Sequence, residues 1–354
     1  MRPFRFLAAL LLLLSAPARA DDVLHLYNWN NYISDATLAR FESQCRCRVK
    51  QDYYSDNEEM LAKLDAGAVG YDLLVPTGNA VESLIRRNAL RPLDKSRLPH
   101  LANEKREFMN LWFDPGNRYS VPYATTITLV GYNVEKVREL GLPTDTWALI
   151  FEPRWLEKIR GRVTVLNSQR ELMAAAMKYL GYSVQEKDLA KWEEAKRLIL
   201  RAKPYWATFS NSTYIKDLAI GNIWVAHGYS NDMFRAREDA RAAHRPFSIA
   251  FETPREGAVL AVDSFVLHKS GGHPELAQRF IDFMLEGANA ADVSNLIGAG
   301  NPNGAALPHV RPEIAAEPGI FPPATTLSRL EMLRDFDPAM RRALSRMWTE
   351  IKVH

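Results

Sequence analysis

The chain has 354 residues, of which 47% are hydrophobic and 25% are charged, so it can bury sizeable cores and is too apolar to be intrinsically disordered. Its formal charge of +3 depends on Arg2, Arg5 and Arg19, which lie near the start of the chain, where no acid occurs. Without these arginines the basic residues are only as numerous as the 42 acidic ones. The charge balance therefore gives no support for a nucleic-acid partner or an anionic membrane surface.

Residues 1–20 have the features of a secretory signal peptide. Two arginines precede an apolar run over residues 6–14, and Ala18-Arg19-Ala20 supplies small residues at the spacing that signal peptidase needs. The run is too short to stay in the bilayer as an anchor. We expect cleavage before Asp21 and an exported mature chain. Lipid attachment is not expected, because position 21 is not a cysteine.

Short β-like runs alternate with helical patterns along the rest of the chain. The first three strands are expected at 23–27, 48–54 and 71–76. Between them we expect one helix capped by Ser34 or Asp35, and a second that is capped by Asp56 or Asn57 and ends at Gly67. A later helix is expected at 186–202, and later strands at 126–132, 162–166, 223–226, 247–251 and 259–267. This order predicts an α/β fold with a largely parallel sheet that helices cover on both faces.

Only two cysteines occur, Cys45 and Cys47, and they are separated by one residue. A redox or metal-binding pair is one interpretation. A bridge between them would close a small, strained ring, and no further cysteine or histidine pair completes a zinc site. We therefore expect Cys47 to alternate with Val49 on a strand as a small apolar residue.

The motifs of common enzyme classes fail when they are tested against this chain. The segment from Gly228 to Asp232 begins like a nucleophile elbow, but Asp232 stands where a second glycine is required. The glycines at 298, 300 and 304 do not have dinucleotide-binding spacing, and no phosphate-binding loop occurs. We therefore expect no enzymatic activity, no cofactor and no metal.

Aromatic and acidic residues lie at strand ends or in the loops that follow them, where open α/β sheets bind ligands. Trp29 and Tyr32 follow the first strand, and Asp232 follows the strand over 223–226. Asp263 lies inside the apolar run AVLAVDSFVL, where an acid is costly unless a cation or a hydrogen-bond donor meets it. The alternative interpretation is structural: Asp263 forms a helix cap or an internal salt bridge, and Trp29 packs in a core.

Several stretches of the mature chain together resemble one family, the periplasmic putrescine/spermidine-binding proteins of polyamine ABC importers. They occur in the same order as in that family: LHLYNWNNYIS, YDLLVPT, ALRPLDKSRLP, VPYATTITLVGYN, YIKDLAIGNIWVAHGYSND, PREGAVLAVDSF and EPGIFPPA. The resemblance implies a two-lobed periplasmic binding protein fold of type II, with a ligand cleft between the lobes. It assigns residues 21–127 and 259–306 to lobe 1, and residues 128–258 and 307–354 to lobe 2.

The resemblance also implies a set of ligand-binding residues. Carboxylates would face the ammonium groups of the ligand, and aromatic rings would line its methylene chain. The residues that match the family's site are Trp29, Asn30, Tyr32, Thr77, Glu171, Tyr229, Asp232 and Asp263.

Four positions depart from what the family typically has. Ala261 and Ala299 stand where the family has aromatic rings, and Asn31 and Asn167 stand where it often has acids. Each lost ring contact is worth about 0.5–2 kcal/mol. The departures imply either weaker binding of the family's ligands or a pocket enlarged for a bulkier amine.

The function implied is a periplasmic solute-binding protein, a monomer that captures a polyamine or related amine and delivers it to the permease subunits of an ABC importer. An alternative is a periplasmic sensor that reports the amine to a membrane signalling protein. The fold would be the same in both cases, because function depends on the site and on the surfaces offered to partners.

Overall fold

The computed structural model describes residues 22–353, and the expected signal peptide lies outside this range. Ten strands form one continuous sheet. They are β1 (Asp22–Trp29), β2 (Cys47–Tyr54), β3 (Leu73–Leu74), β4 (Leu90–Arg91), β5 (Ser120–Asn133), β6 (Val163–Val165), β7 (Thr208–Phe209), β8 (Val225–Tyr229), β9 (Ile249–Glu252) and β10 (Leu260–His268). Within residues 22–353 no helix is long and apolar enough to cross a membrane.

In the part of the chain that the structure describes, fifteen α-helices surround the sheet. In chain order they are α1 (Asp35–Cys45), α2 (Asn57–Asp65), α3 (Gly78–Arg86), α4 (Val134–Leu140), α5 (Ala148–Phe151), α6 (Pro153–Leu156), α7 (Gln169–Tyr179), α8 (Leu189–Ala202), α9 (Thr213–Ile220), α10 (Ser230–Ala242), α11 (Pro274–Leu285), α12 (Gly287–Ile297), α13 (Pro312–Ala315), α14 (Ala324–Leu327) and α15 (Pro338–Val353). The first two begin where their caps predicted. The Ser34 side chain accepts from the backbone N–H of Thr37, and that of Asp56 accepts from the N–H of Glu59.

The sheet is mixed, so the prediction of a largely parallel sheet was wrong. The strand order is β2-β1-β3-β10-β5-β8-β6-β7, and β1 is parallel to β2 and β3. β10 is antiparallel to β3 and β5, and β5 is antiparallel to β8. The reason is that β5 carries the chain away from the first strands, and β10 brings it back beside β5 in the opposite direction after the whole second half of the sheet has been formed.

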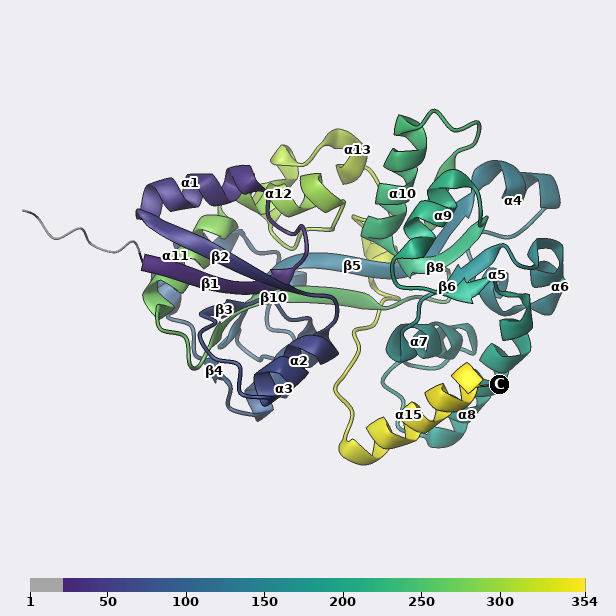
Figure 1. Cartoon of the computed structure of the whole chain (residues 1–354), viewed down its shortest axis with the longest axis horizontal. Helices are drawn as coiled ribbons and strands as arrows, with labels where there is room; N and C mark the ends of the chain where they lie inside the picture. Colours follow the sequence, from purple (N-terminus) through teal and green to yellow (C-terminus); the bar gives the residue numbers. More distant parts are fainter. Residues whose placement is uncertain (1–21, 354) are drawn as a thin grey trace, which may run out of the picture.

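Two strands join the halves of the molecule. Residues 120–127 of β5 pair with β10, whereas residues 128–133 pair with β8 and β9. Figure 1 shows β5 and β10 crossing the middle of the molecule, with β1–β4 on one side and β6 and β8 on the other. A third segment accompanies them, because Glu331 exchanges backbone hydrogen bonds with Ala258 and Leu260.

Each half has its own apolar core. On the side of β1–β4, two clusters form around Phe41 and Phe280 and around Tyr27 and Met60. On the side of β6–β9, a larger cluster includes Trp147 and many other fully buried side chains. We call these halves the first lobe (β1–β4, α1–α3 and α11) and the second lobe (β6–β9, α4–α10 and α15).

Several predicted elements differ from the structure in extent. The run at 71–76 contributes only Leu73–Leu74 to the sheet, and the strand predicted at 126–132 begins earlier, at Ser120. The helix predicted from 186 begins at Leu189, because the Asp188 side chain caps it by accepting from the N–H of Ala190.

The two cysteines form a disulfide, so the expectation of unpaired thiols was wrong. Cys45 ends α1 and Cys47 begins β2, and Arg46 between them adopts a left-handed conformation with φ of 55°. This turn brings the two Cα atoms to 5.2 Å, within the range that a disulfide bridges. Cys47 is nevertheless buried among apolar residues of the first lobe, as predicted.

Gly228 of β8 has no room for a side chain, which leads to a stability prediction. A Cβ at this position would lie 2.5 Å from the Tyr214 ring and 2.6 Å from Cε of Met233. We expect Gly228→Ala to lower the free energy of unfolding by about 1–3 kcal/mol, because the buried neighbours must shift. Denaturant unfolding measures this change. Gly272→Ala, where the added Cβ meets nothing within 4 Å, is the control, and equal stability of the two variants would contradict the prediction.

Candidate ligand-binding site

Asp263 lies at an irregularity of β10 and faces the first lobe. The register between β10 and β5 shifts between Asp263 and Ser264, a bulge of the kind that re-aims side chains next to functional sites. Thr77 Oγ1 donates to Asp263 Oδ1 at 2.6 Å, and the Tyr32 hydroxyl donates to Oδ2 at 3.0 Å. The carboxylate is almost fully buried, and burial raises its pKa to about 6 despite these two hydrogen bonds.

Asp232 lies in the first turn of α10 in the second lobe. The hydroxyl of Tyr214, which lies on α9, donates to Asp232 Oδ2, and Asn231 Nδ2 contacts the other oxygen at 3.3 Å. Burial raises the pKa of Asp232 to about 6, and the Tyr214 hydrogen bond opposes this rise. The second lobe therefore holds a partly buried carboxylate whose strongest donor is a neutral hydroxyl.

Glu171 is the third buried carboxylate, and it lies in the first turn of α7. Thr128 Oγ1, from β5, donates to Glu171 Oε2 at 2.6 Å. Burial raises the pKa of Glu171 to about 7, the Thr128 hydrogen bond and the charge of Arg170 lower it, and Glu58 raises it. Two carboxylates of the second lobe and one at β10 thus share the same chemistry of burial and hydroxyl donors.

Tyrosine side chains show that these acids form one cluster. Burial raises the pKa of Tyr229, and the charges of Glu171, Asp232, Glu58 and Asp263 raise it further. Burial likewise raises the pKa of Tyr32, with further contributions from Asp263 and Asp232. Because charge effects weaken with distance, acids from both lobes must lie around these two rings.

Trp29 packs against neighbouring rings, as the structural interpretation predicts. Its Nε1 donates to the backbone oxygen of Val75 at 2.9 Å, and its ring packs 4.5 Å from that of Tyr54 and 6.2 Å from that of Tyr32, measured between centroids. The side chain remains partly exposed. The ring is therefore fixed in place beside Tyr32 while keeping accessible surface.

The remaining predicted positions do not join the carboxylate cluster in the same way. Asn30 and Asn31 are exposed. Asn167 is also exposed, and its Oδ1 accepts from Lys352 of α15 at 2.8 Å, so its side chain is engaged outside the cluster. Ala299 is fully buried within a core of the first lobe, whereas Ala261, two residues before Asp263, keeps some exposed surface.

The sequence analysis missed several residues that support the site. Asn57 Nδ2 donates to Thr77 Oγ1 at 3.1 Å, and Tyr214 and Thr128 supply hydroxyls to Asp232 and Glu171. Only Asn57 had a local signal, because it follows the strand beside β1. Arg170, which precedes Glu171, was also missed.

The cluster has an excess of negative charge. Within residues 22–353, no lysine, arginine or histidine forms a salt bridge with the carboxylates of Asp263, Asp232 or Glu171. In the same part of the chain, no group of three or more metal-ligating side chains could hold a metal ion. The arrangement is thus suited to a cation that brings its own hydrogen-bond donors.

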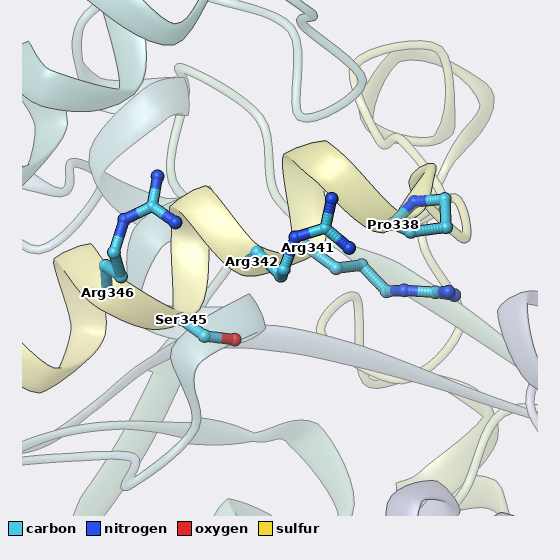
Figure 2. A pocket seen from close by; sticks show the side chains of 5 residues that line it. All are labelled: Pro338, Arg341, Arg342, Ser345 and Arg346. Atoms are coloured by element: carbon cyan, nitrogen blue, oxygen red, sulfur yellow. The ribbon is translucent and has the colours of Figure 1, made fainter.

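A different surface has the opposite charge. Figure 2 shows a hollow on α15, which is lined by Pro338, Arg341, Arg342, Ser345 and Arg346. A neighbouring hollow is shared with α3 and includes Arg86 and Arg87. Guanidinium groups repel cations, so these hollows are unsuited to the ligand that the acidic cluster would hold.

Comparison with known proteins identifies the family. Residues 36–322 match the family described as bacterial extracellular solute-binding protein. The chain belongs to this family. It is 55% identical over 347 residues to the putrescine/cadaverine-binding protein of Pseudomonas aeruginosa, with 98% of each chain covered. It is 34% identical to the putrescine-binding periplasmic protein PotF of Escherichia coli, with 95% of this chain and 92% of that protein covered.

Solved structures confirm the fold. The TpPotD lipoprotein of Treponema pallidum matches with a TM-score of 0.82 and 29% identity, over 94% of this chain and 100% of that one. PotD of Streptococcus pneumoniae, a spermidine/putrescine ABC transporter substrate-binding protein, matches with a TM-score of 0.83 and 24% identity, over 94% of this chain and 99% of that one. The predicted family, its two-lobed α/β fold of type II and the solute-binding function are thus confirmed.

The raised pKa of Asp263 makes the stability of this solute-binding protein depend on pH. The folded-state pKa of about 6 exceeds the ordinary value of 3.8, so the folded chain keeps a proton that the unfolded chain loses between these values. Stability from this group is therefore present at low pH and is lost as the pH rises through about 6. Without ligand, we expect Asp263→Asn to melt at a higher temperature than the wild type above about pH 7, and the gap to close toward about pH 4.

Thermal unfolding across this pH range measures the difference. Burial lowers the pKa of His227 to about 3, so the folded state of both proteins loses stability in acid. Because wild type and variant share His227, this loss does not change the difference between their melting temperatures. Asp239→Asn, on the same helix as Asp232 but paired with Arg235 at the surface, is the control and should show no such gap. A wild type that is the more stable above pH 7 would contradict the expectation.

Proposed function

We propose that this solute-binding protein captures an aliphatic amine with at least two ammonium groups between its lobes and delivers it to the permease subunits of an ABC importer. One observation carries the proposal: Asp263 and Glu171 are buried and Asp232 is partly buried, and none of the three has a salt-bridged protein cation in residues 22–353. The names of the relatives, which are putrescine-, cadaverine- and spermidine-binding proteins, support it.

The chemistry of the site suits an amine. An ammonium group carries several N–H donors and a positive charge, so it can satisfy a carboxylate whose protein donors are all neutral. The partly exposed rings of Trp29, Tyr32 and Tyr229 offer faces to the methylene chain and to its charged ends. The proposed ligand-binding residues are those of the sequence analysis, with Asp263 and Asp232 as the principal charge partners.

The proposal includes the setting in which the protein works. We place the mature chain in the periplasm as a monomer without enzymatic activity, exported through the signal peptide at residues 1–20. The lobe boundaries of the sequence analysis are part of the proposal. Strand β5 pairs with β10 up to Ile127 and with β8 from Thr128 onward. This change of partner supports the lobe boundary between residues 127 and 128.

Charge removal tests the proposed site. We expect Asp263→Asn and Asp232→Asn each to weaken binding of putrescine or cadaverine by about tenfold or more, because a charge-assisted hydrogen bond contributes roughly 1.5–3 kcal/mol. Isothermal titration calorimetry at neutral pH measures the dissociation constants. Asp239→Asn is the matched control and should bind like the wild type. Unchanged affinity in both site variants would contradict the assignment, and no binding of any amine by the wild type would contradict the function.

Ala261 tests whether a missing ring weakens binding. It is partly exposed on β10, two residues before Asp263, where the family typically has an aromatic side chain. We expect Ala261→Phe to strengthen putrescine binding by about 1 kcal/mol, since a ring there would cover apolar surface of a slim diamine. Calorimetry on the two proteins checks this. Ala299→Tyr is a separate variant, because Ala299 is buried in the core and a ring there must displace neighbours. Weaker putrescine binding by a stably folded Ala261→Phe would favour a bulkier natural ligand.

A further inference from the structure

Asp335 lies in the segment that leads to α15, and arginines from both lobes share its carboxylate. Arg86, the last residue of α3 in the first lobe, donates to Asp335 Oδ2. Arg341, in the first turn of α15 in the second lobe, donates to Oδ1 at 2.9 Å. Only 5% of the Asp335 side chain is exposed, so the carboxylate meets these guanidinium groups in place of water. One carboxylate therefore holds a helix of each lobe.

The residues on either side of Asp335 also contact different lobes. The Arg334 guanidinium lies over the ring of Trp112, 4.3 Å from its centroid, and Trp112 packs against a core of the first lobe. The Phe336 ring packs edge-on against that of Trp192, on α8 of the second lobe, with 5.8 Å between centroids. This segment is therefore fixed to both lobes at the point where Asp335 pairs with its arginines.

On the first-lobe side, α3 connects Asp335 with the proposed site. The helix begins directly after Thr77, whose hydroxyl donates to Asp263, and it ends at Arg86. Glu82 in the same helix accepts from the backbone N–H of Asp335 at 3.0 Å. One end of α3 is thus attached to the acid on β10, and its other end is attached to Asp335.

On the second-lobe side, α7 makes the corresponding connection. Arg170, the residue before Glu171, has its Nη2 3.9 Å from Asp335 Oδ1. The Nη1 of Arg170 donates to the backbone oxygen of Arg334 at 3.1 Å. A continuous series of contacts therefore runs from Asp263 through α3 and Asp335 to the helix that carries Glu171.

We propose that Asp335 is a positioning residue for ligand capture, which sets the distance across the lobe junction between Asp263 and the acids of the second lobe. This inference rests on the proposed function. A diamine must span that distance with its methylene chain, so a fixed distance favours diamines of one length. Without the Asp335 charge, Arg86 and Arg341 repel each other, and the lobes adopt a wider range of distances. Diamines of several lengths then bind with similar affinity.

A role of Asp335 in stability alone predicts a different result. Its loss would then lower the melting temperature and reduce the affinities of all diamines by the same factor. Arg87 provides a matched control for Arg86, because it is the next residue in the chain but pairs with Asp65 within the first lobe. Loss of Arg87 removes the same charge without breaking a contact between the lobes.

The experiment measures dissociation constants for unbranched α,ω-diamines of three to eight carbons by calorimetry at neutral pH. The proteins are the wild type, Asp335→Asn, Arg86→Gln, the charge-conserving Arg86→Lys, and Arg87→Gln. We expect the wild type to prefer one length, and the ratio of its weakest to its tightest dissociation constant to fall by about fivefold or more in Asp335→Asn and Arg86→Gln. In Arg86→Lys and Arg87→Gln the ratio should stay within about twofold of the wild-type ratio.

Each outcome has a definite meaning. Arg86→Gln keeps the pair of Asp335 with Arg341, so it gives the test even where Asp335→Asn does not fold. An unchanged ratio in Arg86→Gln overturns the role of Asp335 and leaves the proposed function standing. An equal fall in Arg87→Gln, or a wild type that binds all the diamines equally, also overturns it. If the wild type binds no amine, the proposed function fails and this inference fails with it.

Discussion

The rest of the structure depends on one constraint: three carboxylates, two of them buried and Asp232 partly buried, lie at the junction of the lobes with hydroxyl donors in place of salt-bridged cations. An ionised acid in such surroundings is costly unless it is paired, and one neutral hydrogen bond compensates only part of the cost. The raised pKa values of Asp263, Asp232 and Glu171 express this cost directly. The three acids therefore have no matching positive charge from the protein, which the proposed dication would supply. A site built in this way gives up stability of the empty protein in favour of affinity.

The sheet positions this cluster. Asp263 lies in β10, and the irregularity after it allows Thr77 to reach the carboxylate from the turn that begins α3. On the second lobe, Asp232 and Glu171 both occupy first turns of helices, where the helix dipole favours an anion. Since β5 and β10 run through both lobes, the two groups of acids are attached to the same pair of strands. A small change where these strands cross would move one group relative to the other.

The sequence predicted those elements whose stabilising contacts lie within a few residues of each other along the chain. The caps at Ser34 and Asp56 satisfy backbone donors within a few residues, so the sequence contains the whole interaction. Asp263 was also predictable, because an acid in an apolar strand requires a partner. The antiparallel return of β10, the contact of Tyr214 with Asp232 and the position of Arg170 depend on segments far apart in the chain, and one sequence does not encode them in any local pattern. The Cys45–Cys47 bridge was missed for a different reason, since it depends on the left-handed conformation of Arg46.

In the proposed function, the division of the carboxylates between the lobes favours a ligand that is charged at both ends. Asp263 takes its donors, Thr77 and Tyr32, from the first lobe, whereas Asp232 takes its donor, Tyr214, from the second. A monoamine pairs with one of these acids and leaves the other buried and unpaired, so closure around it recovers only part of the desolvation cost. A ligand with an ammonium group at each end pairs with both, and its methylene chain spans the junction against the aromatic rings. In the proposed function, charge at both ends would couple binding to closure of the lobes, and the length between the charges would determine which such ligand fits.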